Sequence, residues 1–322
     1  MPRRGDDGKL TGDMASLRYR VLAPIAGMDN TGLQHRIFPT HADTDADTIQ
    51  RALDADVMVF CKAFIPRHEQ LLRMAAAQGV KTIFDICDNL YPHPTIGPVC
   101  AAMSNLADQV VCNTPQMAEI ASRYSRRAAA VVDDPFEGQR GEPRTVATIE
   151  KLLWFGHRSN LSSIENCLDD LSQHSKRRPL ELTLLTNEDQ DFRSVIDKAN
   201  ARYGPKLSLK LKPWSLENLW SELSACDAVI VPGTLNDRTR TKSANRTVEA
   251  LWAGRPVVAQ PMPAVDKYAV WTPVSPSIAA GLAELEARPA FYADQLRAAQ
   301  DYIERHNSPR VIAAEWKTLI VG

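Results

Sequence analysis

Residues 57–85 begin with Val57-Met-Val-Phe-Cys61, continue with a helical pattern from Arg67 to Gln78, and return through Gly79 to Lys81-Thr-Ile-Phe-Asp85. The two apolar runs are short and rich in β-branched and aromatic residues, as buried strands are. Gly79 stands where glycine ends helices in a left-handed cap. A strand–helix–strand unit with continuous apolar strands is typical of a parallel sheet covered by helices on both faces.

The same alternation continues along the chain. Before the polar stretch 137–150 we expect a helix near 98–107, a strand at 109–112 and a helix from Pro115 to about Tyr124, with Asn113-Thr114-Pro115 as its cap and first turn. After that stretch we expect strands at 152–155, 180–185, 207–211, 228–231 and 256–259, helices at 161–172, 190–201, 216–225 and 243–253, and a helical end from about 279 to 320 with a break at 307–309.

This pattern predicts an α/β protein made of two tandem Rossmann-like domains, each a doubly wound parallel sheet, facing a cleft. The polar stretch sets the boundary, so the expected domains are residues 1–137 and 138–322, with the last helix able to pack back on the first domain.

Composition excludes several classes of protein. The 322 residues are 44% hydrophobic and 24% charged, with a formal net charge of −1, which does not fit a disordered chain or a fibre. A near-neutral chain gives no reason to expect a nucleic-acid partner. The six cysteines form no C-x-x-C pair, and no histidine cluster has zinc spacing, so no metal site is expected. With no apolar leader and no 18-residue apolar run, we expect a cytoplasmic protein without a transmembrane segment.

The first ordered element is ambiguous. Tyr19 to Ala26 could be an opening strand, or Ser16 could cap a helix that starts near Leu17. Pro24 fits neither a central strand nor a helix interior.

The most informative polar segment is Thr241-Lys-Ser-Ala-Asn-Arg-Thr-Val-Glu-Ala-Leu251. Five basic residues against two acidic ones give the region from Thr234 to Arg255 a local charge of +3. A helix N-terminus offers unpaired N–H groups and partial positive charge, so Lys242 beside a helix capped by Ser243 would make a phosphate site. Glu249, about two turns into the helix, could accept hydrogen bonds from a ribose. A solvated basic loop is an equally good interpretation of the charge pattern alone.

A second loop has similar character. Gly156-His157-Arg158-Ser159-Asn160 follows the strand at 152–155 and precedes a helix. Gly156 allows close backbone approach, and Arg158 could hold a phosphate with two parallel hydrogen bonds. Alone, this is an ordinary strand-to-helix turn, and it is not the dinucleotide fingerprint.

Together these segments resemble the C-terminal half of nucleotide-sugar glycosyltransferases of the two-Rossmann type, the GT-B "group 1" transferases. The resemblance lies in Leu153-Trp-Phe-Gly-His-Arg-Ser-Asn160, in Lys242-Ser-Ala-Asn-Arg246 with Glu249-Ala-Leu251 and Gly254-Arg-Pro-Val-Val258, and in Tyr302-Ile-Glu-Arg-His-Asn-Ser-Pro309 with Trp316. Phe84-Asp-Ile-Cys-Asp-Asn-Leu90, Ala107-Asp-Gln-Val-Val-Cys-Asn-Thr114 and Ser16-x-Arg18-Tyr-Arg20 with Pro24 are similar to segments of the first half more loosely. The last of these favours the helical alternative at the start of the chain.

The resemblance implies transfer of a sugar from a nucleoside diphosphate donor to an acceptor hydroxyl, without a metal or other cofactor, and with retention, the commoner outcome in this branch of the family. It implies donor contacts from Gly156, His157, Arg158, Asn160, Lys242, Ser243, Asn245, Arg246 and Glu249, of which Arg158 and Lys242 stabilise the departing diphosphate. The first domain would bind a saccharide, lipid-linked or small-molecule acceptor through Arg18, Arg20 and Asp88, and a lipid-linked acceptor would bring peripheral membrane contact.

Two positions depart from the family pattern. Many retaining members carry two glutamates eight positions apart; the second matches Glu249, but the first falls on Thr241. The usual Arg…Lys pair after the first strand is represented by Arg158 alone, so Lys242 would supply the second charge. A nucleotide-sugar epimerase of the same fold and a non-catalytic nucleotide-sugar binding protein are the alternatives.

Several carboxylates also require an interpretation. Asp85 and Asp88 follow a strand at the edge that should carry ligands, where either could orient an acceptor hydroxyl or act as general base, with helix capping as the competing role. Asp43-x-Asp45-x-Asp47 has the spacing of a cation site, but we favour caps and first-turn acids of a helix from about Ala46 to Leu53.

Overall fold

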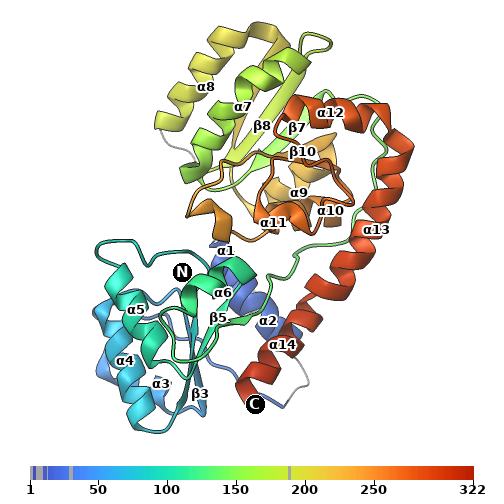
Figure 1. Ribbon diagram of the computed structural model, residues 1–322. Helices are drawn as coiled ribbons and strands as arrows, with labels where there is room; N and C mark the ends of the chain where they lie inside the picture. The colour runs from blue at the N-terminus through green and yellow to red at the C-terminus, as the bar shows by residue number, and fades with distance from the viewer. Residues whose placement is uncertain (1–2, 5–9, 13, 29–31, 188–189) are drawn as a thin grey trace. The chain divides into compact units, whose positions relative to one another are not determined.

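The computed structural model describes residues 3–4, 10–12, 14–28, 32–187 and 190–322, and its contacts divide the chain into two compact units (Figure 1). The first unit contains the residues up to Pro135 together with Arg240–Ser243 and His306–Gly322. The second contains Phe136–Thr239 and Ala244–Arg305. Short segments from late in the sequence therefore belong to the first unit.

The first unit is built on a parallel sheet with the order β3-β4-β5-β6. Its strands are β3 (Val57–Cys61), β4 (Lys81–Asp85), β5 (Gln109–Cys112) and β6 (Ala130–Val131), connected through α4 (Pro66–Ala77), α5 (Gly97–Leu106) and α6 (Pro115–Ala121). The expected strands and helices are confirmed, and β6 is an addition. Thr114 caps α6 as predicted, since its side chain accepts the N–H of Met117.

After two short antiparallel strands, β1 (Arg3–Arg4) and β2 (Leu10–Thr11), the chain forms a helical segment, which resolves the ambiguity at Tyr19–Ala26. It consists of α1 (Ala15–Leu17), a single π-helical turn η1 (Arg18–Leu22) and α2 (Ala23–Gly27). Met14, not Ser16, is the N-cap residue. The interpretation of Asp43-x-Asp45-x-Asp47 as acids at the start of a helix is confirmed. Asp45 caps α3 (Ala46–Leu53), because its side chain accepts the backbone N–H of Thr48 at 2.7 Å.

The last helix completes one face of the first sheet. Ile312 and Trp316 of α14 (Pro309–Val321) form one cluster with Ile83, Val111 and Val132. Helix α14 also lies alongside α2 (Figure 1), and a Cβ atom at Gly27 would stand 2.4 Å from the carbonyl oxygen of Pro309. The two helices therefore pack at a distance that only glycine permits.

The second unit contains a parallel sheet with the order β11-β10-β7-β8-β9. Its strands are β7 (Lys151–Phe155), β8 (Leu180–Thr186), β9 (Leu207–Pro213), β10 (Ala228–Val231) and β11 (Val257–Ala259); its helices include α7 (Leu161–His174), α8 (Gln190–Tyr203), α9 (Leu216–Ala225), α10 (Asn245–Trp252), α11 (Pro263–Asp266) and α12 (Ile278–Ala287). Leu153 and Phe155 belong to one apolar cluster and Leu152 and Trp154 to another, so both faces of β7 are buried. This explains the continuous apolar runs.

Three details of the second half differ from the expectation or extend it. The polar stretch 137–150 has no helix or strand, yet it is bonded to this unit, with Gly141 N donating to Trp252 O and Arg144 N to Gly254 O. Gly254 ends α10 with φ +72°, the left-handed conformation expected of it. The terminal helical region has a second break, between α12 and α13 (Pro289–Asn307). No helix among the described residues is long and apolar enough to cross a membrane.

Candidate functional site

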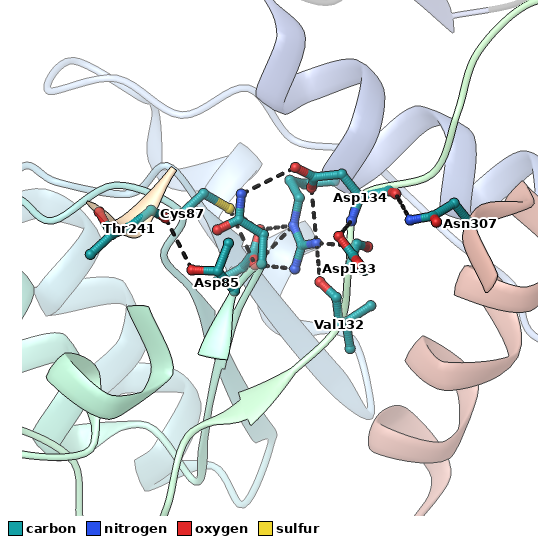
Figure 2. Close-up of polar contacts among 10 residues, drawn as sticks. Asp85, Cys87, Val132, Asp133, Asp134, Thr241 and Asn307 are labelled. Atoms are coloured by element: carbon teal, nitrogen blue, oxygen red, sulfur yellow. Dashed lines mark hydrogen bonds and ion pairs between the residues drawn. The ribbon is translucent and has the colours of Figure 1, made fainter. Parts of the chain in front are cut away.

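The carboxyl ends of the strands in the first sheet carry the polar residues of this unit. Because parallel strands end at the same edge, residues far apart in sequence meet there. The edge is made of Lys62 after β3, Asp85 to Asp88 at and after β4, Asn113 and Thr114 after β5, and Asp133 and Asp134 after β6. Figure 2 shows polar contacts at this edge, including those of Thr241 and Asn307 from later segments of the chain.

Arg20 is the centre of a buried ion-pair network. Its Nη2 atom lies 2.8 Å from Asp85 Oδ1, and its Nη1 atom lies 3.2 Å from Asp134 Oδ1. Burial alone would lower the pKa of Arg20, but the two carboxylates outweigh it and hold that pKa above its ordinary value. The Arg20 and Asp85 side chains are 1% and 0% exposed, so the residues expected to touch acceptor and to act as base are enclosed in protein.

Arg18 is likewise buried. It lies on the π-helical turn η1, and its guanidinium carbon stands 5.4 Å from the centroid of the Tyr19 ring. An acceptor contact from Arg18 or Arg20 would therefore have to be indirect, and it is Arg20 that bonds residues of the edge.

Asp134 joins several segments and was not among the expected site residues. Burial and the neighbouring Asp133 raise the pKa of Asp134, while Arg20 and hydrogen bonds from Ser243 and Asn113 oppose the rise. Its backbone oxygen accepts Asn307 Nδ2 at 3.0 Å, which ties in the segment before α14 (Figure 2). The only sequence signal was the run Ala128-Ala-Ala-Val-Val-Asp-Asp134, an apolar run that ends in acids as β4 does.

The segment Arg240–Ser243 is fastened to this edge. Thr114 Oγ1, which caps α6, also donates to the carbonyl oxygen of Thr241 at 3.0 Å (Figure 2). The Ser243 side chain hydrogen-bonds Asp134. The prediction that Ser243 caps the following helix is wrong, because α10 starts at Asn245 with Ala244 as its N-cap and the Ser243 hydroxyl is used by a carboxylate.

Asp88 is held by two lysines. Lys62 Nζ lies 3.1 Å from its Oδ2 atom, and Lys242 bonds its Oδ1 atom. Burial would raise the pKa of Asp88, but Lys242 and then Lys62 outweigh it and lower that pKa to about 2. Asp88 therefore stays ionised near neutral pH and is a weak proton acceptor.

Lys62 adopts an unusual backbone conformation. Its φ is +52°, the left-handed region that favours glycine. This conformation costs a side-chain-bearing residue roughly 1–2 kcal/mol, whereas a solvent-exposed ion pair contributes at most about 1 kcal/mol. The bond to Asp88 does not by itself account for a lysine here, and no sequence pattern indicated it.

The second unit places the loop after β7 as expected. Gly156 N donates to Leu185 O at 3.2 Å, and a Cβ atom at Gly156 would stand 3.1 Å from the Trp154 ring, so the turn is close-packed. His157 Nδ1 accepts the backbone N–H of Ser159 at 3.2 Å. Residues Arg158–Asn160 form one 3-10 turn before α7, and the Arg158 side chain is exposed.

Helix α10 carries Asn245, Arg246 and Glu249. Glu249 is 1% exposed, and its Oε1 atom accepts the backbone N–H of Glu137 at 2.9 Å. Arg246 Nη1 is buried and finds no hydrogen-bond partner in the described part of the chain. Burial lowers the pKa of Arg246 to about 10, with no carboxylate to oppose it. A half-buried cation with an enclosed, unbonded N–H group and no counter-charge, in the first turn of a helix, is an arrangement that an anionic ligand can complete.

The expected site residues thus form two groups. Arg18, Arg20, Asp85, Asp88, Lys242 and Ser243 belong to the first unit, and Gly156, His157, Arg158, Asn160, Asn245, Arg246 and Glu249 belong to the second.

Comparison with known proteins identifies the fold. No protein-family model matches the sequence, and neither does any curated protein. The structure is similar to HepE of Anabaena in complex with UDP, with a TM-score of 0.66 and 16% identity over 86% of this chain and 81% of that one. It is similar to a glycosyltransferase from Rickettsia africae, with a TM-score of 0.64 and 10% identity over 92% and 86%.

A third similar structure is a TarM variant from S. aureus in complex with UDP, alpha-GlcNAc-glycerol and fondaparinux, with a TM-score of 0.63 and 12% identity over 85% of this chain and 59% of that one. The chain thus spans little more than half of TarM. The shared architecture is the GT-B fold, two α/β domains on parallel sheets, as the sequence predicted.

Proposed function

We propose that the protein is a glycosyltransferase that moves a sugar from a nucleoside diphosphate donor to an acceptor hydroxyl. One observation carries the proposal: half-buried Arg246, at the start of α10 and in the same helix as Glu249, has an enclosed Nη1 atom without a hydrogen-bond partner or counter-charge in the described part of the chain. A diphosphate would supply the missing negative charge. The UDP present in the HepE and TarM structures supports a nucleotide as its source.

Cationic side chains would stabilise the charge that develops when the bond between sugar and diphosphate breaks. Breaking the bond between the anomeric carbon and the diphosphate oxygen leaves positive charge on the sugar and negative charge on the phosphate. Arg246, Arg158 and Lys242, with the N–H groups in the first turn of α10, would stabilise that phosphate, and each such donor is typically worth a few kcal/mol. Three cationic side chains make a metal ion unnecessary, so we propose metal-independent transfer.

The charge state of Asp88 suggests where the proton of the acceptor hydroxyl goes. Asp88, the half-buried carboxylate of the first unit, has a pKa of about 2 in the ligand-free protein, and the charges of Lys62 and Lys242 would stay near it when phosphate binds, which would keep it a weak base. The departing diphosphate oxygen would then accept the proton, which requires the acceptor to approach from the side of the leaving group. That path retains the anomeric configuration, and we propose retention.

The remaining residues would bind and position. Gly156, His157 and Asn160 would line the donor loop after β7, Ser243 and Asn245 the approach to α10, and Glu249 the ribose. Arg18, Arg20 and Asp85 would support the acceptor edge from within the core, and Asp88 would lie at its surface. The acceptor would be a saccharide, a small molecule or a lipid-linked sugar.

Calorimetric titration with UDP, GDP, CDP and ADP tests the donor site. We expect tight binding of one nucleotide, lost in Arg246→Ala and in Lys242→Ala without loss of the fold by circular dichroism. Lys210→Ala is the matched control, since Lys210 of β9 pairs with Glu181 of β8. Equal binding by the wild type and both site variants would show that the phosphate site is elsewhere.

Product analysis distinguishes the alternatives. A transferase releases nucleoside diphosphate faster when its acceptor is present, an epimerase interconverts the nucleotide sugar without one, and a binding protein does neither. The epimerase is not favoured, because the similar structures named above include a glycosyltransferase and no epimerase. Full activity in a chelator would support metal independence; its loss would contradict it.

A further inference from the structure

In the function proposed so far, Lys62 only pairs with Asp88, and it has no ligand of its own. Among the described residues, Lys62 is the only non-glycine residue with positive φ. It follows β3 directly, at the edge of the sheet where ligands of parallel α/β proteins bind. Residues with a strained backbone conformation are concentrated at active sites and ligand sites.

Lys62 and Lys242 converge on one small anion. Each lysine bonds a different oxygen of the Asp88 carboxylate, so the three residues together carry a charge of +1. A phosphate can be bound in the same way, with one ammonium group on each of two of its oxygens. The carboxylate thus occupies the position that a phosphate would take.

The cluster is accessible, and its backbone is anchored. The side chains of Lys62, Asp88 and Lys242 are 35%, 24% and 40% exposed, so solvent and solutes reach them. The backbone beside Lys242 is held by Thr114 at Thr241, and Asp134 holds the side chain of Ser243. Exchange of one anion for another therefore requires only side-chain movement.

We propose that Lys62 and Lys242 together bind a phosphate group, and that Asp88 holds their ammonium groups in the ligand-free protein. The phosphate is that of the donor diphosphate or of a phosphate ester on the acceptor; the recognised chemistry is the same. The proposal rests on the transferase function above, because that function brings phosphate to Lys242, but it assigns Lys62 and Asp88 roles of their own.

The test uses two probes, UDP and glycerol 3-phosphate, and titrates each into the full chain. Lys62→Gly fits the left-handed backbone, so we expect its melting temperature to be equal to or above that of the wild type. Loss of one charged hydrogen bond to phosphate should weaken binding of the relevant probe by roughly 10-fold. Lys62→Gln, which keeps the length of the stem without its charge, should weaken it similarly.

Asp88→Asn should change the affinity for phosphate in the opposite direction. It removes the competing carboxylate and leaves both lysines, so the same probe should bind several-fold more tightly. Glu181→Gln is the matched control, because it removes the carboxylate partner of Lys210 at the amino end of β8 and should change neither affinity.

The outcomes separate the two proposals. Weaker UDP binding in Lys62→Gly assigns the site to the donor, and weaker glycerol 3-phosphate binding alone assigns it to an acceptor. If Arg246→Ala loses UDP while the Lys62 variants bind both probes like the wild type, the Lys62 site is wrong and the donor site stands. If the wild type binds no nucleotide but Lys62→Gly weakens glycerol 3-phosphate binding, the donor assignment fails and the Lys62 site stands. If the wild type binds neither probe, both are wrong.

Discussion

Arg20 in the first unit is buried and Arg246 in the second is half-buried with its Nη1 atom enclosed, and their surroundings are opposite. Arg20 bonds two carboxylates, and its pKa is held above its ordinary value. Arg246 has no carboxylate to oppose its burial, and its pKa falls to about 10. A buried cation with its counter-charges in the chain holds the fold together, whereas one without them destabilises the free protein and points to a ligand.

The largest effect should come from breaking the compensated network. Asp85→Ala leaves Arg20 without its bidentate partner in a buried position, which typically costs about 3–5 kcal/mol. We expect a large fall in the urea midpoint of unfolding. Asp301→Ala is the control, since Arg140 and Asp301 form an exposed pair that should contribute less than about 1 kcal/mol. Equal effects of the two substitutions would show that the Arg20 network is not structural.

Arg246→Met should raise the stability of the free protein, whereas Asp85→Ala lowers it. It removes an uncompensated, half-buried charge and keeps the apolar stem, so the ligand-free protein should become more stable while nucleotide binding is lost. In calorimetry each kcal/mol gained raises Tm by about 2–4 °C for a unit of this size. Arg246→Lys keeps the charge and should gain less. A lower Tm for Arg246→Met would mean that the chain itself compensates this guanidinium, and the contrast with Arg20 would fail.

The double role of Thr114 gives an intermediate effect. Thr114→Val removes the cap of α6, at a cost of about 1 kcal/mol, and also the bond to Thr241. We expect UDP affinity to fall several-fold, because the segment beside Lys242 loses an anchor. Ser308→Ala removes the cap of α14 in the same unit and should lower stability similarly without changing affinity. Thr114→Ser keeps both bonds and should resemble the wild type; reduced UDP affinity in Ser308→Ala as well would attribute the effect to stability alone.

The smallest effect concerns acid stability. The pKa of Asp88 is lowered in the folded protein, so its contribution is present above the unfolded value near 4 and is lost as the pH falls toward 2. Because the pair is partly exposed, the contribution should be under about 1 kcal/mol. Wild type should therefore lose slightly more unfolding free energy than Asp88→Asn between pH 4 and pH 2. Asp134, whose pKa is raised, gains a stabilising contribution as the pH falls from neutral toward the unfolded value near 4, so over that range Asp134→Asn should lose slightly more unfolding free energy than the wild type.

The sequence predicted what depends on local pattern. The apolar runs at 57–61, 81–85 and 109–112 became β3, β4 and β5, and Asp45 and Thr114 cap the helices expected of them. Strand β6 escaped prediction because two residues give no periodicity.

Long-range pairing could not be predicted in the same way. Asp85 was expected to face an acceptor, but Arg20, 65 positions away, encloses it. Ser243 was expected to cap α10, but Asp134 takes its hydroxyl. The positive φ of Lys62 has no signature in a residue that is usually found in helices and strands.

The packing of α14 on the first sheet has a consequence for synthesis. During translation the residues up to Pro135 emerge first, but the apolar surface formed by Ile83, Val111 and Val132 lacks its cover until Ile312 and Trp316 are made. Domains are generally expected to fold from the N-terminus as they leave the ribosome. Here the second unit can close while the first still exposes one face of its sheet, so we expect the half made first to finish folding last.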